Sequence, residues 1–330
     1  MLRSGSRPAC LAARKEALVP GGTRAGARPD EASAISVWCR ALNWLNSANM
    51  TRHPLALIVS RFKREPSRTG SLIITFYGDA ILPRGGSVWL GTLLQFLEML
   101  EIDGGVVRTA VSRLAADGWL DRDKVGRKSF YRLAKRGRER FEAAVEHVYN
   151  PHPSDWSGRF EVLLIGNGAD RESSRTALIE AGFGNPIPGV WVAPSGVPVP
   201  PEADGAIRLE ASAAEEAGRR LIGESWSLER TADSYRNFLK TFSPLKDWAA
   251  VTGALDPADA LLARILMIHH YRRVILRDPL LPAALLPADW PAAEARQFCG
   301  RMYQALLPAS EKWLNEHGES LSGPLPALGA

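Results

Sequence analysis

The residues best suited to contact a charged partner lie between positions 104 and 118. Apolar residues recur there at intervals of three and four, which places on one face of a helix Val107, Ala110, Val111, Leu114 and Ala115. The opposite face carries Arg108, Thr109, Ser112 and Arg113. A guanidinium group pairs with guanine edges or phosphates, and a hydroxyl donates to phosphate. The pattern indicates a helix that packs by one side and contacts nucleic acid by the other.

A basic turn follows this helix. Residues 119–120 and 130–133 predict two strands, and the tip between them carries Lys124, Arg127 and Lys128. A hairpin tip of this charge can reach the phosphate backbone beside a groove. Any surface helix of a small basic domain shows a similar polar face, so the interpretation depends on the order of the surrounding elements.

Those elements occur in the order of a winged helix-turn-helix. Apolar periodicity predicts a helix over 68–84, a second helix capped by Ser87 and running to about residue 100, and a third ending at Asp117 and Gly118. The hairpin comes next, followed by an amphipathic helix over 135–148. We assign the DNA-binding fold to the region from 68 to 133, within a domain of residues 50–150.

The remaining chain divides into three further parts. Strands over 159–165, 189–193 and 206–210, with helices over 170–181 and 211–222, predict a ferredoxin-like α+β domain of residues 151–225. Residues 226–330 predict a helical C-terminal domain for effector binding or dimerisation. Residues 1–49 are expected to be a disordered N-terminal extension. The predicted fold class is therefore α+β.

The charge of the chain is divided unevenly. Residues 1–49 hold 7 basic and 3 acidic residues, residues 50–150 hold 17 and 11, and residues 151–330 hold 17 and 22. A basic front and an acidic back indicate a polyanionic partner for the front. Cys10, Cys39 and Cys299 lack metal or disulfide spacing, and the chain has no apolar run of membrane length or secretory signal. We expect a cytoplasmic protein with no membrane segment.

Enzyme motifs are missing from the sequence. It contains no GxSxG elbow, HExxH pair, Walker loop or dinucleotide fingerprint, so we expect neither catalytic residues nor a cofactor. Two alternatives stay open beside a DNA-binding regulator. One is a thioesterase or nuclease-like enzyme that uses the middle or C-terminal domain, and the other is an adaptor whose winged helix binds protein.

The residues also resemble a known family. The matching segments are 71–80, 108–114, the hairpin with Trp119, Gly126, Arg127 and Tyr131, then 188–194, 269–273, 276–282 and 286–291. They resemble the PaaX repressors, which control phenylacetate degradation. The resemblance implies a homodimer of three domains that binds a double-stranded DNA operator. It also implies release from the operator by an aryl-acyl-coenzyme A such as phenylacetyl-coenzyme A.

The resemblance bears on the middle domain as well. That domain is similar to a CRISPR-associated nuclease subunit. Asn167 stands after the first strand, where a metal-binding carboxylate is needed, and Asp170 lies farther on. We therefore expect no nuclease activity.

A second polar cluster gives the implied effector a candidate site. Its members lie within about two and a half helical turns, with one aromatic residue farther on: His269, His270, Tyr271, Arg272, Arg273, Arg277 and Trp290. Arginine binds phosphate well, and Tyr or Trp surfaces suit an aryl group. The alternative is structural: residues 277–279 end the helix and Trp290 lies in the core. Adjacent histidines point about 100° apart, so we expect no metal site.

Overall fold

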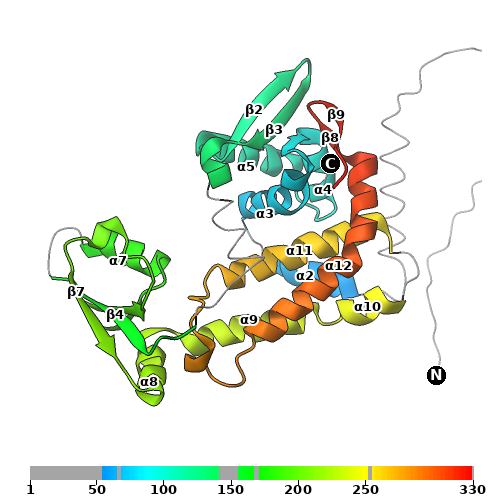
Figure 1. Cartoon of the computed structure of the whole chain (residues 1–330). Helices are drawn as coiled ribbons and strands as arrows, with labels where there is room; N and C mark the ends of the chain where they lie inside the picture. Colours follow the sequence, from blue (N-terminus) through cyan, green and yellow to red (C-terminus); the bar gives the residue numbers. More distant parts are fainter. Residues whose placement is uncertain are drawn as a thin grey trace, which may run out of the picture. The chain divides into compact units, whose positions relative to one another are not determined.

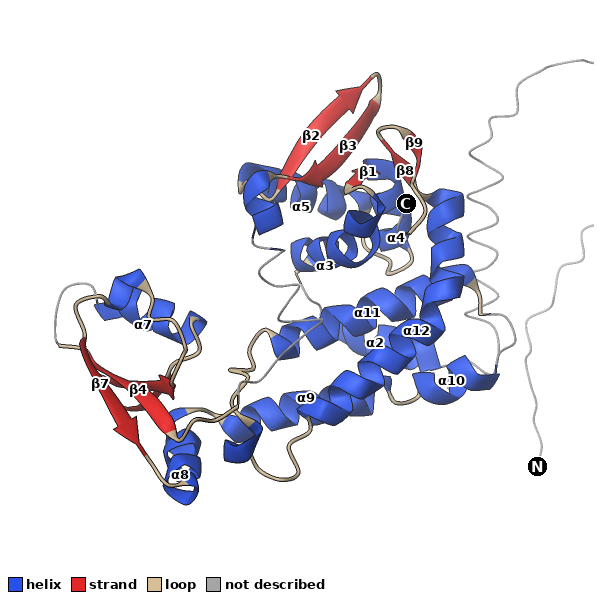
Figure 2. Cartoon of the chain, in the orientation of Figure 1, coloured by secondary structure: helices blue, strands red, loops and turns tan. Residues whose placement is uncertain are grey.

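The computed structural model describes residues 54–64, 68–139, 141, 155–166, 171–251 and 255–328 (Figure 1). The predicted extension of residues 1–49, most of the predicted helix beyond residue 139, and the Asn167 and Asp170 positions lie outside these ranges. Helices and antiparallel sheets occur together (Figure 2), so the α+β class is confirmed.

The first helices differ from the prediction in two ways. Helix α2 (Pro54–Arg64) was not predicted. Helix α3 (Thr69–Phe76) continues through a π-helical turn (Tyr77–Ile81) and a 3-10 turn (Leu82–Arg84), so the segment is helical throughout but changes its hydrogen-bonding pattern. Both helices carry residues of the main hydrophobic core.

The second predicted helix begins later than expected. Ser87 does not cap a helix, because Ser87–Trp89 form strand β1 and pair with residues of strand β3. Helix α4 (Leu90–Glu98) starts only after Trp89. Gly85 and Gly86 have positive φ angles of 89° and 75°, a conformation that glycine adopts without steric cost. The turn they make delivers the chain to the sheet, and this pairing overrides the local capping preference.

The third helix and the hairpin follow the predicted order. Helix α5 (Gly104–Ala116) is capped by Asp103, whose Oδ1 accepts a hydrogen bond from the Gly105 N–H at 2.7 Å. Strands β2 (Leu120–Val125) and β3 (Lys128–Leu133) form the hairpin, and the sheet order is β1-β3-β2 (Figure 2).

The middle region contains a four-stranded antiparallel sheet in the order β5-β6-β4-β7. Its elements are β4 (Arg159–Leu164), α7 (Arg171–Glu180), β5 (Gly184–Ile187), β6 (Val190–Pro194), β7 (Ile207–Ser212) and α8 (Glu215–Ser225). Strand β5 was not predicted, since its sequence GNPI has no alternating pattern. The predicted helix over 211–222 begins at Glu215 because Ala211 and Ser212 still pair with β4.

The C-terminal region is mainly helical. Its elements are α9 (Leu228–Phe242), α10 (Leu245–Val251), α11 (Pro257–Ile275), α12 (Ala292–His317) and the short strands β8 (Glu319–Ser320) and β9 (Gly323–Pro324). One hydrophobic cluster joins residues of α3, α4 and α5 to residues of α9, α11 and α12. The candidate DNA-binding helices therefore share a core with the C-terminal helices. No helix in the described ranges has the length and apolar character needed to span a bilayer.

Candidate functional site

Helix α5 presents its two faces as the residue pattern suggests. Val107 and Val111 are buried against α3 and α4, whereas Arg108, Thr109, Ser112 and Arg113 are exposed. The Thr109 hydroxyl donates to the Gly105 carbonyl at 2.9 Å, so its proton is used within the helix. The guanidinium groups of Arg108 and Arg113 are therefore the hydrogen-bond donors of this face that extend farthest from the helix.

The tip of the β2–β3 hairpin adds two exposed cations, Lys124 and Arg127. Gly126 lies at the turn with a φ of 59°, which suits glycine. Farther down the hairpin, Arg122 donates to Ser129 at 2.8 Å, and Arg132 lies 3.5 Å from an Asp121 carboxylate oxygen. These two arginines make contacts within the hairpin that stabilise it. The two cations at the tip are exposed to solvent.

Lys128, the third predicted hairpin cation, is paired. Its ammonium donates to both carboxylate oxygens of Glu319 at 2.7 Å and lies 4.7 Å from the centre of the Trp89 ring. Glu319 belongs to the short C-terminal strand β8, which contacts β1. Sequence reasoning missed this contact because a surface glutamate 191 positions away carries no local signal.

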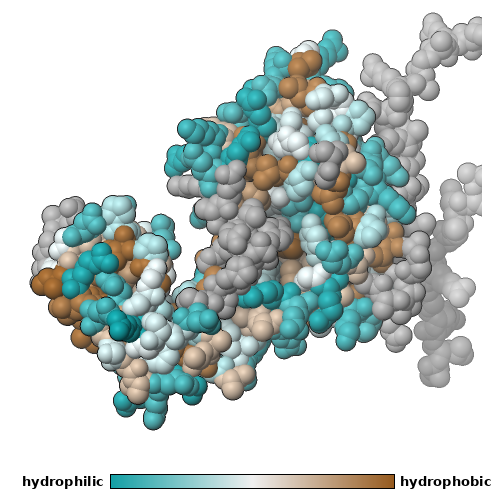
Figure 3. All heavy atoms as spheres, in the orientation of Figure 1, coloured by the Kyte–Doolittle hydropathy of each residue, from teal (hydrophilic) through white to brown (hydrophobic). Residues whose placement is uncertain are grey.

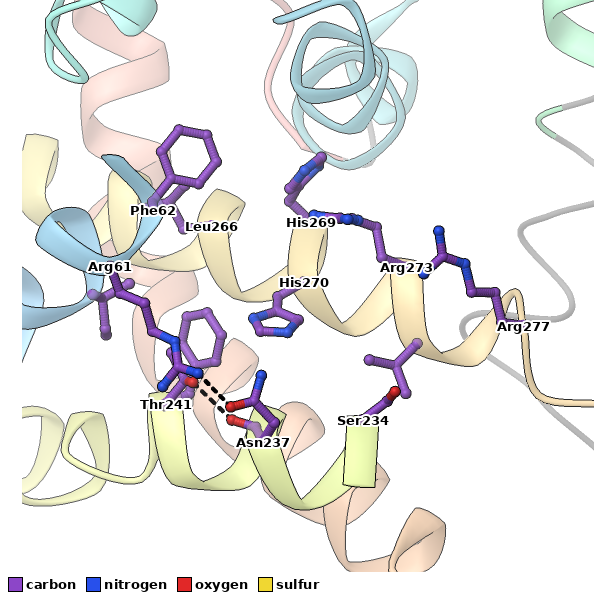
Figure 4. A pocket seen from close by; sticks show the side chains of 13 residues that line it. Arg61, Phe62, Ser234, Asn237, Thr241, Leu266, His269, His270, Arg273 and Arg277 are labelled. Carbon is purple, nitrogen blue, oxygen red and sulfur yellow. Dashed lines mark hydrogen bonds between the residues drawn. The ribbon is translucent and has the colours of Figure 1, made fainter. Parts of the chain in front are cut away.

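A cavity of about 220 Å³ lies between α2, α9 and α11 (Figure 4). Four of the seven predicted effector residues line it: His269, His270, Arg273 and Arg277. The other three lie elsewhere. Successive residues on a helix point about 100° apart, so one cluster in sequence cannot all face one cavity.

The residues outside the cavity have structural surroundings. Tyr271 is 3% exposed and its ring lies 5.4 Å from that of Phe238 in the core. Trp290 packs edge to face on Tyr235, with ring centres 6.4 Å apart. The Tyr235 hydroxyl in turn donates to Asp278 at 2.6 Å, just beyond the end of α11. Arg272 is half-buried and does not line the cavity.

Sequence reasoning missed the cavity residues contributed by α2 and α9. They are Ile58, Arg61, Phe62, Ser234, Asn237, Thr241 and Phe242. Arg61 donates to the Asn237 side chain at 2.5 Å across the cavity (Figure 4). The lining includes three arginines and two histidines but no aspartate or glutamate. This composition favours an anionic ligand group, and the apolar walls favour a ligand with an apolar part.

His269 connects the cavity to α3. It is 2% exposed, and its Nδ1 lies 2.9 Å from the Thr75 Oγ1. The Thr75 Oγ1 also lies 3.0 Å from the Ser71 carbonyl, and when its hydroxyl donates there, the Nδ1–H of His269 is the donor to Thr75. The buried Nε2 is then an unprotonated acceptor, and it has no hydrogen-bond partner. Burial, followed by the charges of Arg272 and Arg273, lowers the pKa of His269 to about 3 and keeps it neutral.

Buried ion pairs provide a second connection between the same regions. Arg264, fully buried on α11, donates to Asp79 at 2.7 Å and to Glu311 at 2.6 Å. Arg84 donates through Nε to the other Glu311 oxygen at 3.0 Å and through Nη1 to Asn315 at 3.0 Å. Two arginines and two carboxylates balance, which limits the cost of burying them. The network ties the end of the α3 segment to α11 and α12.

No group of three His, Cys, Asp or Glu side chains in the described part of the chain is arranged to hold a metal ion. The polar features with functional potential are thus the exposed face of α5, the hairpin tip and the cationic cavity. His269 joins the cavity to α3, and the buried ion network joins the end of the α3 segment to α11 and α12.

The comparisons with known proteins agree with the resemblance seen in the sequence. The family model of PaaX-like proteins matches residues 68–137, and that of the PaaX-like C-terminal domain matches residues 226–316. The chain is 37% identical to the transcriptional repressor PaaX of Escherichia coli strain K12, over 79% of this chain and 87% of the relative. A solved structure of an uncharacterized Mycobacterium tuberculosis protein is 27% identical with a TM-score of 0.48, covering 66% of this chain and 88% of its own. Because the similar E. coli protein is a transcriptional repressor, the comparison supports a regulator and not an enzyme. The family models and this relative together show that the chain belongs to the PaaX family.

Proposed function

We propose that this chain is a transcriptional repressor that binds a double-stranded DNA operator of an aromatic, phenylacetate-type catabolic operon. It acts as a homodimer and is released by an aryl-acyl-coenzyme A such as phenylacetyl-coenzyme A. The observation that carries the DNA assignment is the exposed face of α5 with Arg108, Thr109, Ser112 and Arg113. A helix buried on one side and cationic on the other is the element that enters a major groove.

The order of elements supports a winged helix-turn-helix in residues 50–150. Helices α3, α4 and α5 precede the β2–β3 hairpin, and α5 packs on both earlier helices. The antiparallel order β5-β6-β4-β7 supports a ferredoxin-like assignment for residues 151–225, although a 3-10 turn (Pro201–Ala203) replaces the second crossover helix. We assign residues 226–330 to a helical C-terminal domain for effector binding or dimerisation.

DNA binding is tested with an operator fragment selected by the protein itself from random duplexes. Arg113→Ala is expected to weaken binding and to reduce the slope of log affinity against log salt by about 0.9 per chain, because one phosphate contact is lost. Arg175→Ala is the matched control, since Arg175 is an exposed arginine of α7 and does not belong to the α5 face. Equal binding by wild type and Arg113→Ala at every salt concentration contradicts the α5 assignment. Binding that ignores salt altogether favours the protein-adaptor alternative.

The effector is proposed to place an anionic group in the cavity, against Arg273 of α11, Arg277 just beyond the end of α11, and Arg61 of α2. A cavity of about 220 Å³ suits an aryl-acyl group or a single phosphate, not a whole coenzyme A thioester. Tyr271, Arg272 and Trp290 remain predicted effector residues, although they do not line this cavity.

The geometry offers a route from ligand to DNA. His269 touches both the cavity and Thr75 of α3, and α3 packs against α5. A ligand that favours a shifted α11 thereby disfavours the α3–α5 arrangement that binds DNA. The loss of operator affinity cannot exceed the ligand's preference for that shifted conformation.

A titration of the preformed protein–operator complex with phenylacetyl-coenzyme A tests this route. Wild type is expected to release DNA, and Arg273→Ala is expected to need at least tenfold more thioester because a charge-assisted contact is lost. Arg301→Ala, an exposed arginine of α12 outside the cavity, serves as the control. A complex that persists at saturating thioester refutes the effector but leaves the DNA assignment intact.

A further inference from the structure

Val106 is an aliphatic residue exposed on a helix face that otherwise carries polar side chains. It is 50% exposed, on the face of α5 that carries Arg108, Thr109 and Arg113. Figure 3 shows hydrophilic atoms over much of the visible surface around the β2–β3 hairpin and α5, with smaller groups of hydrophobic atoms between them. An exposed valine gains little from burial in the free protein, and it favours a helix less than alanine does. Valine at this position therefore gains apolar contacts only when a partner covers it.

The local structure places Val106 at the beginning of the helix. Asp103 caps α5, and Gly104 and Gly105 are its first two residues, so Val106 is the first residue of the helix with a side chain. A β-branched residue in a helix is held largely in one rotamer. In a helix-turn-helix, the N-terminal residues of the recognition helix are the ones that contact base edges. Val106 occupies such a position.

Val106 begins a stripe along α5 that continues with Thr109 and Arg113. Residues three, four and seven positions apart lie on the same side of a helix. The Thr109 hydroxyl donates to the Gly105 carbonyl at 2.9 Å, which leaves the Thr109 methyl group as an apolar neighbour of Val106 on this stripe. Arg113 lies two turns, about 10 Å, farther along the helix. The stripe therefore has an apolar end and a cationic end.

We propose that Val106, together with the Thr109 methyl group, recognises the 5-methyl group of a thymine in the major groove of the operator. The inference rests on the proposed function, because it requires α5 to enter that groove, and it names the base feature that α5 recognises. In unmodified DNA, the thymine methyl is the apolar group among the base edges of the major groove. A phosphate contact by Arg113 positions the helix but carries no sequence information. Val106 then supplies specificity at one base pair.

The size and surroundings of the apolar end favour DNA over a protein partner. One valine and one methyl group are far too small to form the core of a protein interface. They match the size of a single base methyl. The exposed cations Arg108 and Arg113 of α5, with Lys124 and Arg127 of the hairpin tip, suit a polyanion.

A uracil scan of the selected operator duplex tests the inference. Each thymine is replaced in turn by uracil, which keeps the base pairing and the O4 acceptor but lacks the methyl group. Wild type is expected to bind about fourfold more weakly when the thymine that Val106 contacts in one half-site is replaced. Val106→Ala is expected to bind the unmodified operator about fourfold more weakly per half-site and to be insensitive to that replacement.

Three control variants separate methyl recognition from other effects. Val125→Ala removes a valine of similar exposure, 57%, from the hairpin tip and is expected to keep the sensitivity to uracil. Thr109→Val retains the methyl group and is expected to keep the sensitivity, whereas Thr109→Ser lacks that group and is expected to reduce it. Val106→Ala should not lower the Tm, because alanine favours a helix. It should also leave the salt slope unchanged, because it removes no phosphate contact.

The possible failures are distinguishable. DNA binding without a uracil-sensitive thymine overturns this inference and leaves the DNA assignment intact, as does a Val106→Ala variant with the sensitivity of wild type. A Val106→Ala variant with a lower Tm and a lower salt slope also overturns it, because Val106 then supports the helix and not a base contact. A protein that selects no duplex contradicts the DNA assignment and this inference together.

Discussion

Replacing Glu319 with glutamine is expected to tighten DNA binding and to steepen its salt dependence. Glu319 holds the ammonium of Lys128 through two 2.7 Å hydrogen bonds, on the hairpin that carries the basic tip. Without the carboxylate charge, Lys128 becomes available to a phosphate, and a negative charge that repels DNA is removed from the same surface. The variant therefore tests whether the C-terminal strand β8 limits the charge of the hairpin.

The size of the effect follows from a count of available cations. Arg108 and Arg113 of α5 and Lys124 and Arg127 of the tip are exposed, which allows four phosphate or base contacts per chain. Each phosphate contact contributes about 0.9 to the slope of log affinity against log salt. A fifth contact in each copy of a dimer adds about 1.8 to that slope. Because both partners of the Lys128–Glu319 pair are partly exposed, losing the pair costs at most about 1 kcal/mol of stability.

Fluorescence anisotropy of a labelled operator, measured from low to moderate salt, provides the assay. The Glu319→Gln slope is compared with wild type, and the same change is then made in a Lys128→Ala background. In that background the gain in slope is expected to vanish, because the cation that Glu319 restrains is gone, and only the smaller gain in affinity from the lost repulsion remains. An unchanged slope in Glu319→Gln, or an equal gain without Lys128, refutes the reasoning.

Three further predictions concern the folded state. Arg264→Met should cost about 3–5 kcal/mol in urea unfolding, because the buried Asp79 carboxylate loses its arginine and Glu311 keeps only Arg84. A loss below about 1 kcal/mol contradicts a tight buried network. Burial and neighbouring arginines lower the pKa of His269 from 6.5 to about 3, so only the unfolded chain takes up this proton as the pH falls through that window. The free energy of unfolding should then fall by up to about 1.4 kcal/mol per pH unit below about pH 6.5, and His269→Gln should lack this pH-dependent loss. Equal pH slopes for the two proteins argue against a buried neutral His269. Gly78→Ala should lower the Tm by several degrees, because the new Cβ would lie 1.9 Å from the Phe141 ring. Gly300→Ala on α12 is the control and should leave the Tm unchanged, because no atom lies within 4 Å of its new Cβ. Equal Tm values for the two variants count against the close contact at Gly78.

The sequence by itself determined the features that depend on local periodicity. The three- and four-residue spacing around α5 separates Val107 and Val111 from Arg108 and Arg113, and the structure buries and exposes them accordingly. Gly118 ends the helix with a φ of 72°, as its residue type predicts. Such signals are local, because a helix or hairpin turn is specified by a few consecutive residues.

Local signals failed where a distant strand decided the outcome. Ser87 has the chemistry of a helix cap, but its pairing with Arg132 places it in β1. Residues 184–187 contain a proline and no alternation, and only their pairing with β6 makes them a strand. In both cases backbone pairing across the sheet outweighs a weak intrinsic preference.

Tertiary structure alone decided how the candidate sites are assembled. Arg61 and Arg273 line one cavity, Lys128 pairs with Glu319, and Arg264 pairs with Asp79 across 185 positions of sequence. A residue pattern predicts whether a side chain is buried or exposed, but it does not name the side chain's partner on a distant element. That choice is made when helices pack, because only the packed core fixes which charges and hydrogen-bonding groups lie within reach of one another.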